Sequence, residues 1–278
     1  MGHRALEGAL QTGLGWQVLG HGRTLTSRAS VLSTVSARRK SRALHMRLAL
    51  PSTRAEMVDV GPYQIAINVP SDKAQLLEEY VAWNTDDKDP GGYERVPYWA
   101  DLWPASVALS THLLSCGQLL QQSRVLEIGA GLGLSGIVAH LVGAREVVLS
   151  DNDPLSILIA EKNVADNRHL LRSGAIEHRN LDWRFPDSWP GNFDCILAAD
   201  VLYERQFADD LGTLIPKLLR PGGHLLMAEP TTRQNRAFFL SALKASLQTS
   251  LGDRPPATRI DQFKKLADGR ITLIRLQL

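Results

Sequence analysis

The sequence predicts an α/β fold in which a mostly parallel sheet is covered by helices on both faces. From residue 124 onward, short apolar runs alternate with longer stretches of helical spacing, as parallel strands joined by helical crossovers require. One apolar run breaks into alternating glycines, Gly129, Gly131 and Gly133, where the next helix begins. The tail departs from this alternation, because two strand-like segments flank Asp268-Gly269, a dipeptide typical of hairpin turns. The tail therefore predicts an antiparallel final pair of strands.

The first predicted elements precede residue 124. Residues 63–69 alternate polar and apolar side chains, as a half-buried strand does, and residues 72–83 follow with helical spacing. Residues 84–92 hold three Asp, one Pro and two Gly, a composition that predicts a solvated loop. A Trp-rich segment, residues 97–104, then leads into a helix that begins at Pro104 and ends at Gly117.

The remaining elements follow in regular order. Strands are predicted at 124–129, 145–150, 175–179, 193–199 and 223–228, and helices at 133–142, 154–168, 205–219 and 232–248. Pro221-Gly222-Gly223 is interpreted as the turn that leads into the strand at 223–228. Two last strands, at 257–263 and 270–276, are predicted to form the C-terminal hairpin.

The chain divides into two parts of different composition. Its net charge is +2, but residues 1–50 hold eight of the 31 basic and one of the 29 acidic residues, which leaves −5 for the rest. Residues 1–57 are interpreted as a disordered or transit-peptide-like segment, and residues 58–278 as one domain. The competing interpretation is that translation starts near Met46 or Met57. A late start predicts a cytoplasmic protein, whereas a transit peptide predicts a mitochondrial or plastid one.

Composition also argues against several classes of function. The two cysteines, Cys116 and Cys195, do not have metal-ligand spacing, and neither do the scattered histidines, so neither a metal site nor a disulfide framework is expected. No apolar run approaches the length of a membrane span, which predicts a soluble protein without membrane partners. The mildly acidic main part gives no support for nucleic-acid binding.

The glycines and the acid after the next strand predict a nucleoside site. Glycine lets the chain turn tightly and brings backbone N–H groups toward a ligand at a helix N-terminus. Asp151 stands 22 residues beyond Gly129, the usual offset for a carboxylate that binds the two ribose hydroxyls. The spacing Gly131, Gly133, Gly136 also satisfies the dinucleotide fingerprint, so a nicotinamide or flavin nucleotide and an oxidoreductase remain an alternative.

Further candidates lie at the ends of neighbouring strands. Glu127 can face the cationic amino group of a methionine moiety, which a dinucleotide lacks. Asp182 and Trp183 follow the third strand of the sheet and can hydrogen-bond and stack an adenine. Ala199 and Asp200 end the fourth strand at the sheet edge where ligands bind, and the small Ala199 lets a ligand approach its backbone.

These motifs resemble those of the seven-strand S-adenosylmethionine-dependent methyltransferases. Glu127–Gly133, Asp151, Leu181-Asp182-Trp183 and Asp200-Val201-Leu202-Tyr203 occur in that family's order and spacing. Asp-x-x-Tyr resembles the branch rich in protein-lysine methyltransferases. Residues 97–104 are similar to those of enzymes acting on the electron-transfer-flavoprotein β subunit and of bacterial nicotinamide N-methyltransferase-like proteins. The resemblance covers residues 60–278 and implies a Rossmann-like seven-stranded sheet with S-adenosyl-L-methionine as the cofactor.

The resemblance also implies a reaction and its residues. Methyl transfer from a sulfonium requires alignment and exclusion of water, which explains why the motifs describe a cofactor cradle rather than a catalytic triad. Trp103 is expected to touch the cofactor, Asp200 to orient a lysine amine, and Tyr203 to wall its channel. A protein lysine is the expected acceptor. A small amine or heteroaromatic such as nicotinamide is the alternative, and a silent cofactor-binding subunit is the non-enzyme one.

One segment departs from the family's pattern. After the strand at 223–228, relatives often carry an Asp-Pro-x-Arg-like sequence, whereas this chain has Glu229 and one additional residue before Arg233. Because this loop faces the substrate side, the resemblance does not extend to the identity of the substrate.

Overall fold

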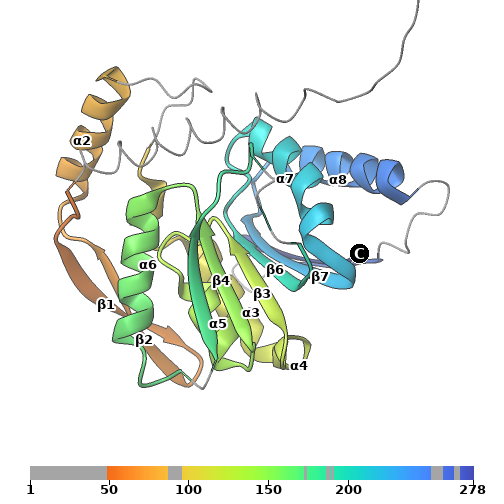
Figure 1. The fold of residues 1–278 in the computed structure, drawn as a ribbon, viewed down its shortest axis with the longest axis horizontal. Helices are drawn as coiled ribbons and strands as arrows, with labels where there is room; N and C mark the ends of the chain where they lie inside the picture. Colours follow the sequence, from red (N-terminus) through yellow and green to blue (C-terminus); the bar gives the residue numbers. More distant parts are fainter. Residues whose placement is uncertain are drawn as a thin grey trace, which may run out of the picture. The chain divides into compact units, whose positions relative to one another are not determined.

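Five parallel strands lie at the centre of the fold (Figure 1). The structure is a computed structural model, and it describes residues 49–86, 96–171, 174–185, 189, 191–251, 259–265 and 270–278. The sheet has the order β5-β4-β3-β6-β7-β9-β8. Its strands are β3 Arg124–Ile128, β4 Glu146–Asp151, β5 Ala175–Asn180, β6 Phe193–Ala199, β7 Leu219–Pro230, β8 Arg259–Lys265 and β9 Ile271–Gln277. Strands β3 to β7 pair in parallel, and β9 runs antiparallel to both β7 and β8. The predicted fold class is confirmed.

The strand order reverses at β3. The chain first proceeds to β4 and β5 on one side and then returns to β6 and β7 on the other. Ligands of open α/β sheets bind outside the carboxyl ends of the strands at such a reversal. β3 ends at Ile128 and β6 at Ala199, so this rule predicts a ligand site beside the next residues, Gly129 and Asp200.

Helices cover both faces of the sheet. α7 (Arg205–Leu218) and α8 (Arg236–Leu251) pack together, and their apolar side chains form one buried cluster with alternate strand residues such as Leu126 and Val148. α3 (Pro104–Ser115), α5 (Leu134–Leu141) and α6 (Pro154–Asp166) lie on the other side, where the pleat directs Leu149. α5 packs so closely there that a Cβ on Gly136 would lie 2.1 Å from Leu149 Cδ2. The short helix α4 (Gly117–Leu120) connects α3 to β3.

An antiparallel hairpin precedes the sheet. β1 (Thr53–Val60) pairs with β2 (Tyr63–Pro70) along its whole length, and α2 (Lys73–Asp86) follows. The sequence predicted β2 and α2 but not β1, and the domain boundary at residues 57 and 58 is therefore too late. The first half of β1 is largely exposed, so its sequence lacks the apolar alternation that identifies a half-buried strand. Residues 1–48, for which the sequence predicts a disordered or transit-like segment, lie outside the described residues.

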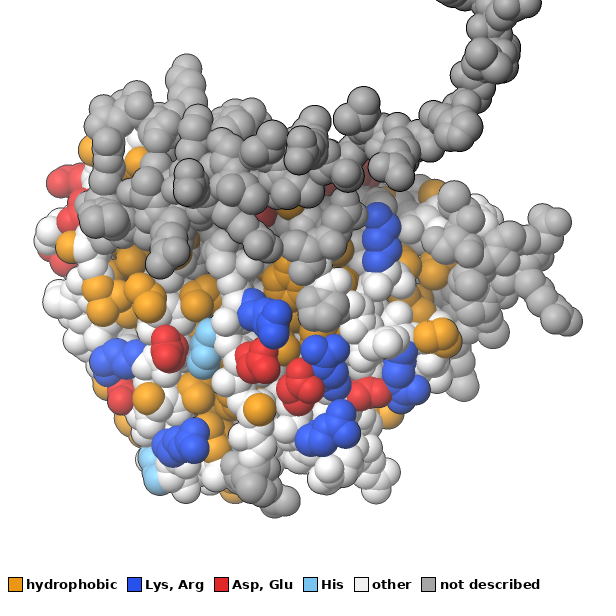
Figure 2. All heavy atoms as spheres, viewed as in Figure 1, with side chains coloured by type: hydrophobic (Ala, Val, Ile, Leu, Met, Phe, Trp, Pro, Cys, Tyr) orange, Lys and Arg blue, Asp and Glu red, His pale blue; other side chains and the backbone are white. Residues whose placement is uncertain are grey.

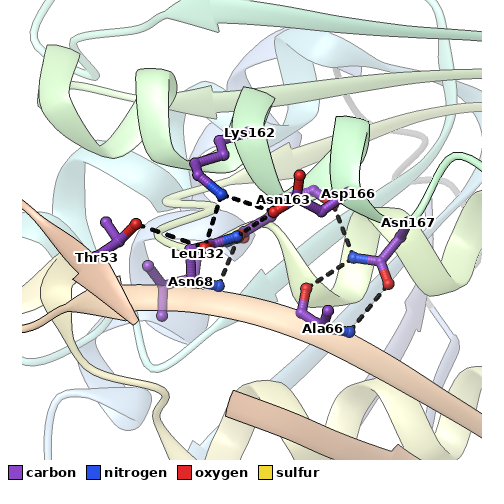
Figure 3. Close-up of polar contacts among 8 residues, drawn as sticks. All are labelled: Thr53, Ala66, Asn68, Leu132, Lys162, Asn163, Asp166 and Asn167. Atoms are coloured by element: carbon purple, nitrogen blue, oxygen red, sulfur yellow. Dashed lines mark hydrogen bonds and ion pairs between the residues drawn. The ribbon is translucent and has the colours of Figure 1, made fainter. Parts of the chain in front are cut away.

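Asn163 of α6 and Asn167, which caps the C-terminal end of that helix, bind the hairpin to the layer of the main sheet (Figure 3). The Asn167 side chain accepts a hydrogen bond from Ala66 N at 2.9 Å and donates one to Ala66 O at 2.7 Å, as a neighbouring strand would. One turn earlier, Asn163 Oδ1 accepts hydrogen bonds from the backbone and side chain of Asn68. Asn163 and Asn167 are fully buried, so buried hydrogen bonds join α6 and its C-terminal cap to β2.

The structure differs from the sequence prediction at one loop and at one turn. Residues 84–86 continue α2 instead of starting a loop, and the rest of the predicted loop lies outside the described residues. Pro221-Gly222-Gly223 is not a turn before a strand but a bulge inside β7, because the β6–β7 register shifts there and Gly222 has a φ of 77°. The Asp268-Gly269 turn also lies outside the described residues, whereas the strands on both sides of it are present.

The surface seen in Figure 2 carries mixed charge. On the described part of that face, basic and acidic side chains alternate with apolar ones rather than gathering by sign. None of the helices that the structure describes combines the length and hydrophobicity that crossing a bilayer requires.

Candidate active site

The loop between β3 and α5 turns through three left-handed glycines. Gly129, Gly131 and Gly133 have φ values of 62°, 53° and 81°, a region that residues with a Cβ rarely adopt. A Cβ on Gly129 would lie 3.0 Å from Val201 Cγ1 and 3.4 Å from Trp183 Cζ2. Glycine is therefore required here by the backbone conformation and, at Gly129, by the close approach of an indole.

A pocket lies beside this loop at the carboxyl ends of β3, β4 and β6, and most of its wall is acidic or aromatic. The acids are Asp151, Asp153, Asp182, Asp200, Glu204 and Asp210, and the aromatic residues are Tyr98, Trp99, Trp103, Trp183, Tyr203 and Phe207. Among the described residues, Arg184 is the only basic one in the wall. Carboxylates attract a cation by charge and ring faces attract it through their quadrupole, so the pocket is suited to a cationic ligand.

Asp151 connects the end of β4 to the glycine loop. Its Oδ2 accepts a hydrogen bond from Gly131 N at 2.9 Å, and its Oδ1 accepts one from Asp153 N at 3.0 Å. Burial raises the pKa of this carboxyl to about 6. Asp153 caps α6 by accepting a hydrogen bond from Leu155 N. The two neighbouring acids therefore have different contacts, and Asp151 is the one bonded to the loop.

Asp182 and Trp183 lie on the β5 side of the pocket. Arg184 holds the Asp182 carboxylate from Nε at 2.8 Å and from Nη2 at 2.5 Å. The Trp183 ring meets Phe207 edge-on, with 5.1 Å between centroids. Trp183 Nε1 is buried, and no described residue accepts a hydrogen bond from it. Buried donors normally have a partner, so this N–H beside the pocket fits an acceptor supplied by a ligand.

Five rings form a continuous series along the pocket. Trp103 contacts Tyr98, Tyr98 contacts Tyr203, Tyr203 contacts Phe207, and Phe207 contacts Trp183, with 5.0–6.3 Å between centroids. Trp103 Nε1 donates to Tyr98 O at 2.7 Å, which fixes the indole. Tyr98, Trp103 and Tyr203 are each about 40% exposed, so this end of the series is open to solvent.

Nine of the eleven predicted site residues line the pocket, and Glu127 and Gly133 do not. The pleat of β3 directs Glu127 toward α5, where its Oε2 accepts a hydrogen bond from Gly136 N at 2.8 Å. Its side chain is buried behind the loop, and burial raises its pKa to about 8. Gly133 lies where a Cβ would touch Leu149 and Ala160, so its role is close packing. The structure thus corrects the expectation that Glu127 faces the ligand.

Asp200 forms a charge cluster with the segment that departs from the family's pattern. Its Oδ1 accepts a hydrogen bond from Arg233 Nη2, and Arg233 Nε lies 3.5 Å from Glu229 Oε2. Glu229 is fully buried, accepts hydrogen bonds from Val201 N and Leu202 N, and has a pKa raised by burial to about 8. Asp200 itself has a φ of 55°, an unusual value for a residue other than glycine. A bonded network therefore holds Asp200 at the end of β6.

Several residues of the wall were not predicted. Phe207 and Asp210 follow Tyr203 at helical spacing along α7, a signal that could have identified them. Arg184 directly follows the predicted Trp183. Its ion pair with Asp182 depends on the turn that the backbone makes between them, which the sequence spacing does not reveal. The Arg233 contact crosses 33 residues of sequence and had no local signal.

Comparison with known proteins matches residues 98–246 to a family described as lysine methyltransferases. The chain belongs to this family. It is 39% identical over 117 residues to a protein N-lysine methyltransferase of Xenopus tropicalis, which covers 42% of this chain and 54% of the relative. It is 35% identical over 115 residues to the electron transfer flavoprotein beta subunit lysine methyltransferase of Danio rerio, covering 41% and 42%. The chain thus spans about half the length of the curated relatives it matches.

The fold also matches a solved methyltransferase. A 16S rRNA methyltransferase of T. thermophilus, solved in complex with S-adenosylmethionine and guanosine, aligns with a TM-score of 0.54 at 17% identity. The alignment covers 83% of this lysine methyltransferase family member and 52% of the ribosomal RNA enzyme. Family membership leaves the oxidoreductase alternative without support, although Gly131, Gly133 and Gly136 do satisfy the dinucleotide spacing.

Proposed function

We propose that this chain is an S-adenosylmethionine-dependent methyltransferase that modifies a lysine side chain of a protein. The observation that carries the proposal is the pocket beside the glycine loop, where six acidic and six aromatic residues meet. The donor is a sulfonium and lysine is an ammonium in solution, so both reactants are cations that such a wall attracts. Membership of the lysine methyltransferase family supports the same acceptor.

The residues present fit this cofactor. S-adenosylmethionine, when bound, supplies a methyl group already activated on sulfur. Asp151 would hold the ribose hydroxyls, because its carboxylate lines the pocket beside the loop. Trp183 would lie against the adenine, and its buried Nε1–H provides a hydrogen-bond donor without a described partner. The backbone of Gly129 and Gly131 forms the floor that a Cβ would fill.

The acceptor side is assigned to Asp200 and Tyr203. A lysine has an ordinary pKa of about 10.4 and must lose its proton before it attacks a methyl group. Arg233 is bonded to Asp200 Oδ1, so Oδ2 remains to accept a hydrogen bond from the incoming amine. Because Arg233 balances one negative charge, Asp200 can orient a neutral amine without strongly favouring the ammonium. Tyr203 and Tyr98 would wall the channel and exclude water.

Methyl transfer to protein extracts tests the proposal. The full chain is incubated with S-adenosylmethionine labelled in the methyl group and with a lysate from which endogenous cofactor has been removed. Label in a discrete protein band, recovered as methyllysine after hydrolysis, is the expected result. Label in the small-molecule fraction alone would establish the small-amine alternative. No transfer, together with no binding of S-adenosylhomocysteine, would refute the methyltransferase assignment.

Asp200→Asn provides the control for the site. Loss of amine orientation should lower turnover by about a hundredfold or more, whereas affinity for S-adenosylhomocysteine should change by less than about threefold. Tyr203→Phe keeps the ring and should have a smaller effect. If cofactor affinity falls in proportion to turnover, Asp200 belongs to the cofactor cradle and its assignment to the amine is wrong.

The proposed compartment is the cytoplasm. Import into a mitochondrion or plastid is the alternative, because residues 1–50 are basic and nearly free of acids. Residues 1–57 fused to a fluorescent protein distinguish the two, since a transit peptide would carry the fusion into the organelle.

A further inference from the structure

Asn163 joins two parts of the chain that are far apart in sequence (Figure 3). Its Oδ1 accepts hydrogen bonds from Asn68 N at 2.7 Å and from Asn68 Nδ2 at 2.8 Å. Its Nδ2 donates to Leu132 O at 2.9 Å. Leu132 lies between Gly131 and Gly133, so one side chain on α6 connects β2 directly to the glycine loop.

The loop depends on such contacts to keep its shape. Its left-handed glycines can adopt many other conformations, and ordering them costs more conformational entropy than ordering other residues. Polar side chains oppose this freedom: Asp151 binds Gly131 N, Ser156 Oγ donates to Gly131 O at 2.9 Å, and Asn163 binds Leu132 O. Without Asn163, the buried carbonyl of Leu132 would lose this partner, which would favour a different loop conformation.

A second route from the same N-terminal segment ends at the same loop. Trp99 Nε1 donates to Tyr80 Oη at 3.1 Å, and the Tyr80 hydroxyl donates to Asp153 Oδ2 at 2.6 Å. Asp153 N in turn donates to Asp151, which binds Gly131 N. The fully buried Tyr80 of α2 therefore supports the loop one residue away from the point that Asn163 holds.

We propose that Asn163 is a positioning residue for the cofactor, and that its side chain, itself bonded to Asn68 of β2, holds the glycine loop in the conformation that binds the ligand. The inference rests on the proposed function for the identity of that ligand, S-adenosylmethionine. It deepens that function, because it makes the cofactor affinity of the site depend on a residue of α6 outside the pocket wall.

Asn167 offers a matched control. It lies one helical turn after Asn163, is equally buried, and binds the same strand β2 through Ala66. Its side-chain hydrogen bonds go to Ala66 and to Asn163 O, and none goes to the glycine loop. Asn167→Ala therefore loosens the hairpin while leaving the bond to Leu132 in place.

Three variants separate the contact of Asn163 with Asn68 from its contact with Leu132. Asn163→Ala removes both contacts, whereas Asn163→Asp keeps an oxygen for Asn68 and replaces only the group that donates to Leu132 O. For these variants and Asn167→Ala, the full chain is studied by thermal denaturation, by calorimetric titration with S-adenosylhomocysteine, and by hydrogen exchange without ligand. The exchange measurement follows the amides of Gly131 and Gly133, which donate to Asp151 and Ala130 in the loop.

Both Asn163 variants should bind S-adenosylhomocysteine about fivefold to tenfold more weakly, the effect of one buried hydrogen bond. Their loop amides should also exchange at least about fivefold faster than in the wild type. Asn167→Ala should lower the melting temperature but leave affinity and loop exchange within about twofold. Asn163→Asp keeps the test available if Asn163→Ala does not fold.

The outcomes distinguish this inference from the proposed function. If the wild type does not bind S-adenosylhomocysteine but loop exchange still separates Asn163 from Asn167, the proposed function is wrong and the positioning role stands. If the wild type binds and the variants at both positions affect affinity and loop exchange equally, or not at all, the positioning role of Asn163 is refuted.

Discussion

Replacing Glu127 by Gln would show whether this buried acid carries a proton in the native protein. Its side chain is 2% exposed, and its Oε2 accepts a hydrogen bond from Gly136 N at 2.8 Å. Burial raises its pKa from an ordinary value of 4.5 to about 8. Between these two values the native state keeps a proton that the unfolded state releases. The free energy of unfolding must therefore fall as pH rises, by up to about 1.4 kcal/mol per pH unit.

The neutral glutamine removes this dependence. Its side-chain carbonyl can still accept the hydrogen bond from Gly136, so the variant should fold at least as stably as the wild type above about pH 8. Over roughly three pH units, the difference between variant and wild type should grow by up to about 4 kcal/mol in favour of the variant. The slope of the variant should not vanish altogether, because burial also raises the pKa of Glu229 to about 8 and that of Asp151 to about 6.

Urea denaturation of both proteins at four pH values from about 5.5 to 8.5 measures the two slopes. The expected result is that the free energy of unfolding falls less steeply with pH in Glu127→Gln, by an amount that corresponds to about one bound proton. Parallel slopes would refute the reasoning, because they would mean that Glu127 is ionised in the native state.

Three further perturbations test other parts of the structure. Arg233→Met leaves the two acids of its cluster without their cation and should lower the free energy of unfolding by about 2–4 kcal/mol; urea denaturation showing a loss below about 0.5 kcal/mol would contradict the cluster. Gly136→Ala places a Cβ 2.1 Å from Leu149 Cδ2 and should cost about 1–3 kcal/mol, so an unchanged melting temperature would disprove this tight packing. A chain beginning at Ala49 should match the full chain in melting temperature, whereas one beginning at Met57 loses half of β1 and should melt several degrees lower; equal melting would show that β1 is dispensable.

The central strands of the sheet could be predicted because they are buried on both faces. Such strands are continuous apolar runs bounded by glycine, proline or acidic residues, and β3, β4 and β6 all have this form. β1 lacks the signal because it belongs to a two-stranded sheet and its first half faces solvent, where sequence is weakly constrained. The alternating glycines and the acids at the strand ends likewise located the pocket, because parallel strands bring their carboxyl ends to one edge.

Contacts across the site could not be predicted in the same way. Whether Glu127 faces the ligand or α5 depends on the pleat of β3, and a run that is apolar on both faces does not reveal which way one polar residue points. The partner of Asp200 is Arg233, whose position is set by packing after β7 rather than by spacing. The meeting of Tyr98 with Tyr203 likewise joins two segments more than a hundred residues apart.

The series of rings also gives the protein its own optical reporter. Trp99, Trp103 and Trp183 are three of the chain's six tryptophans and all line the pocket, and Tyr98 and Tyr203 lie near enough to pass excitation to them. A base stacked on an indole quenches its emission. Occupancy of the pocket should therefore be readable in unlabelled protein as a loss of tryptophan fluorescence, and single Trp→Phe substitutions would reveal which indole the ligand touches.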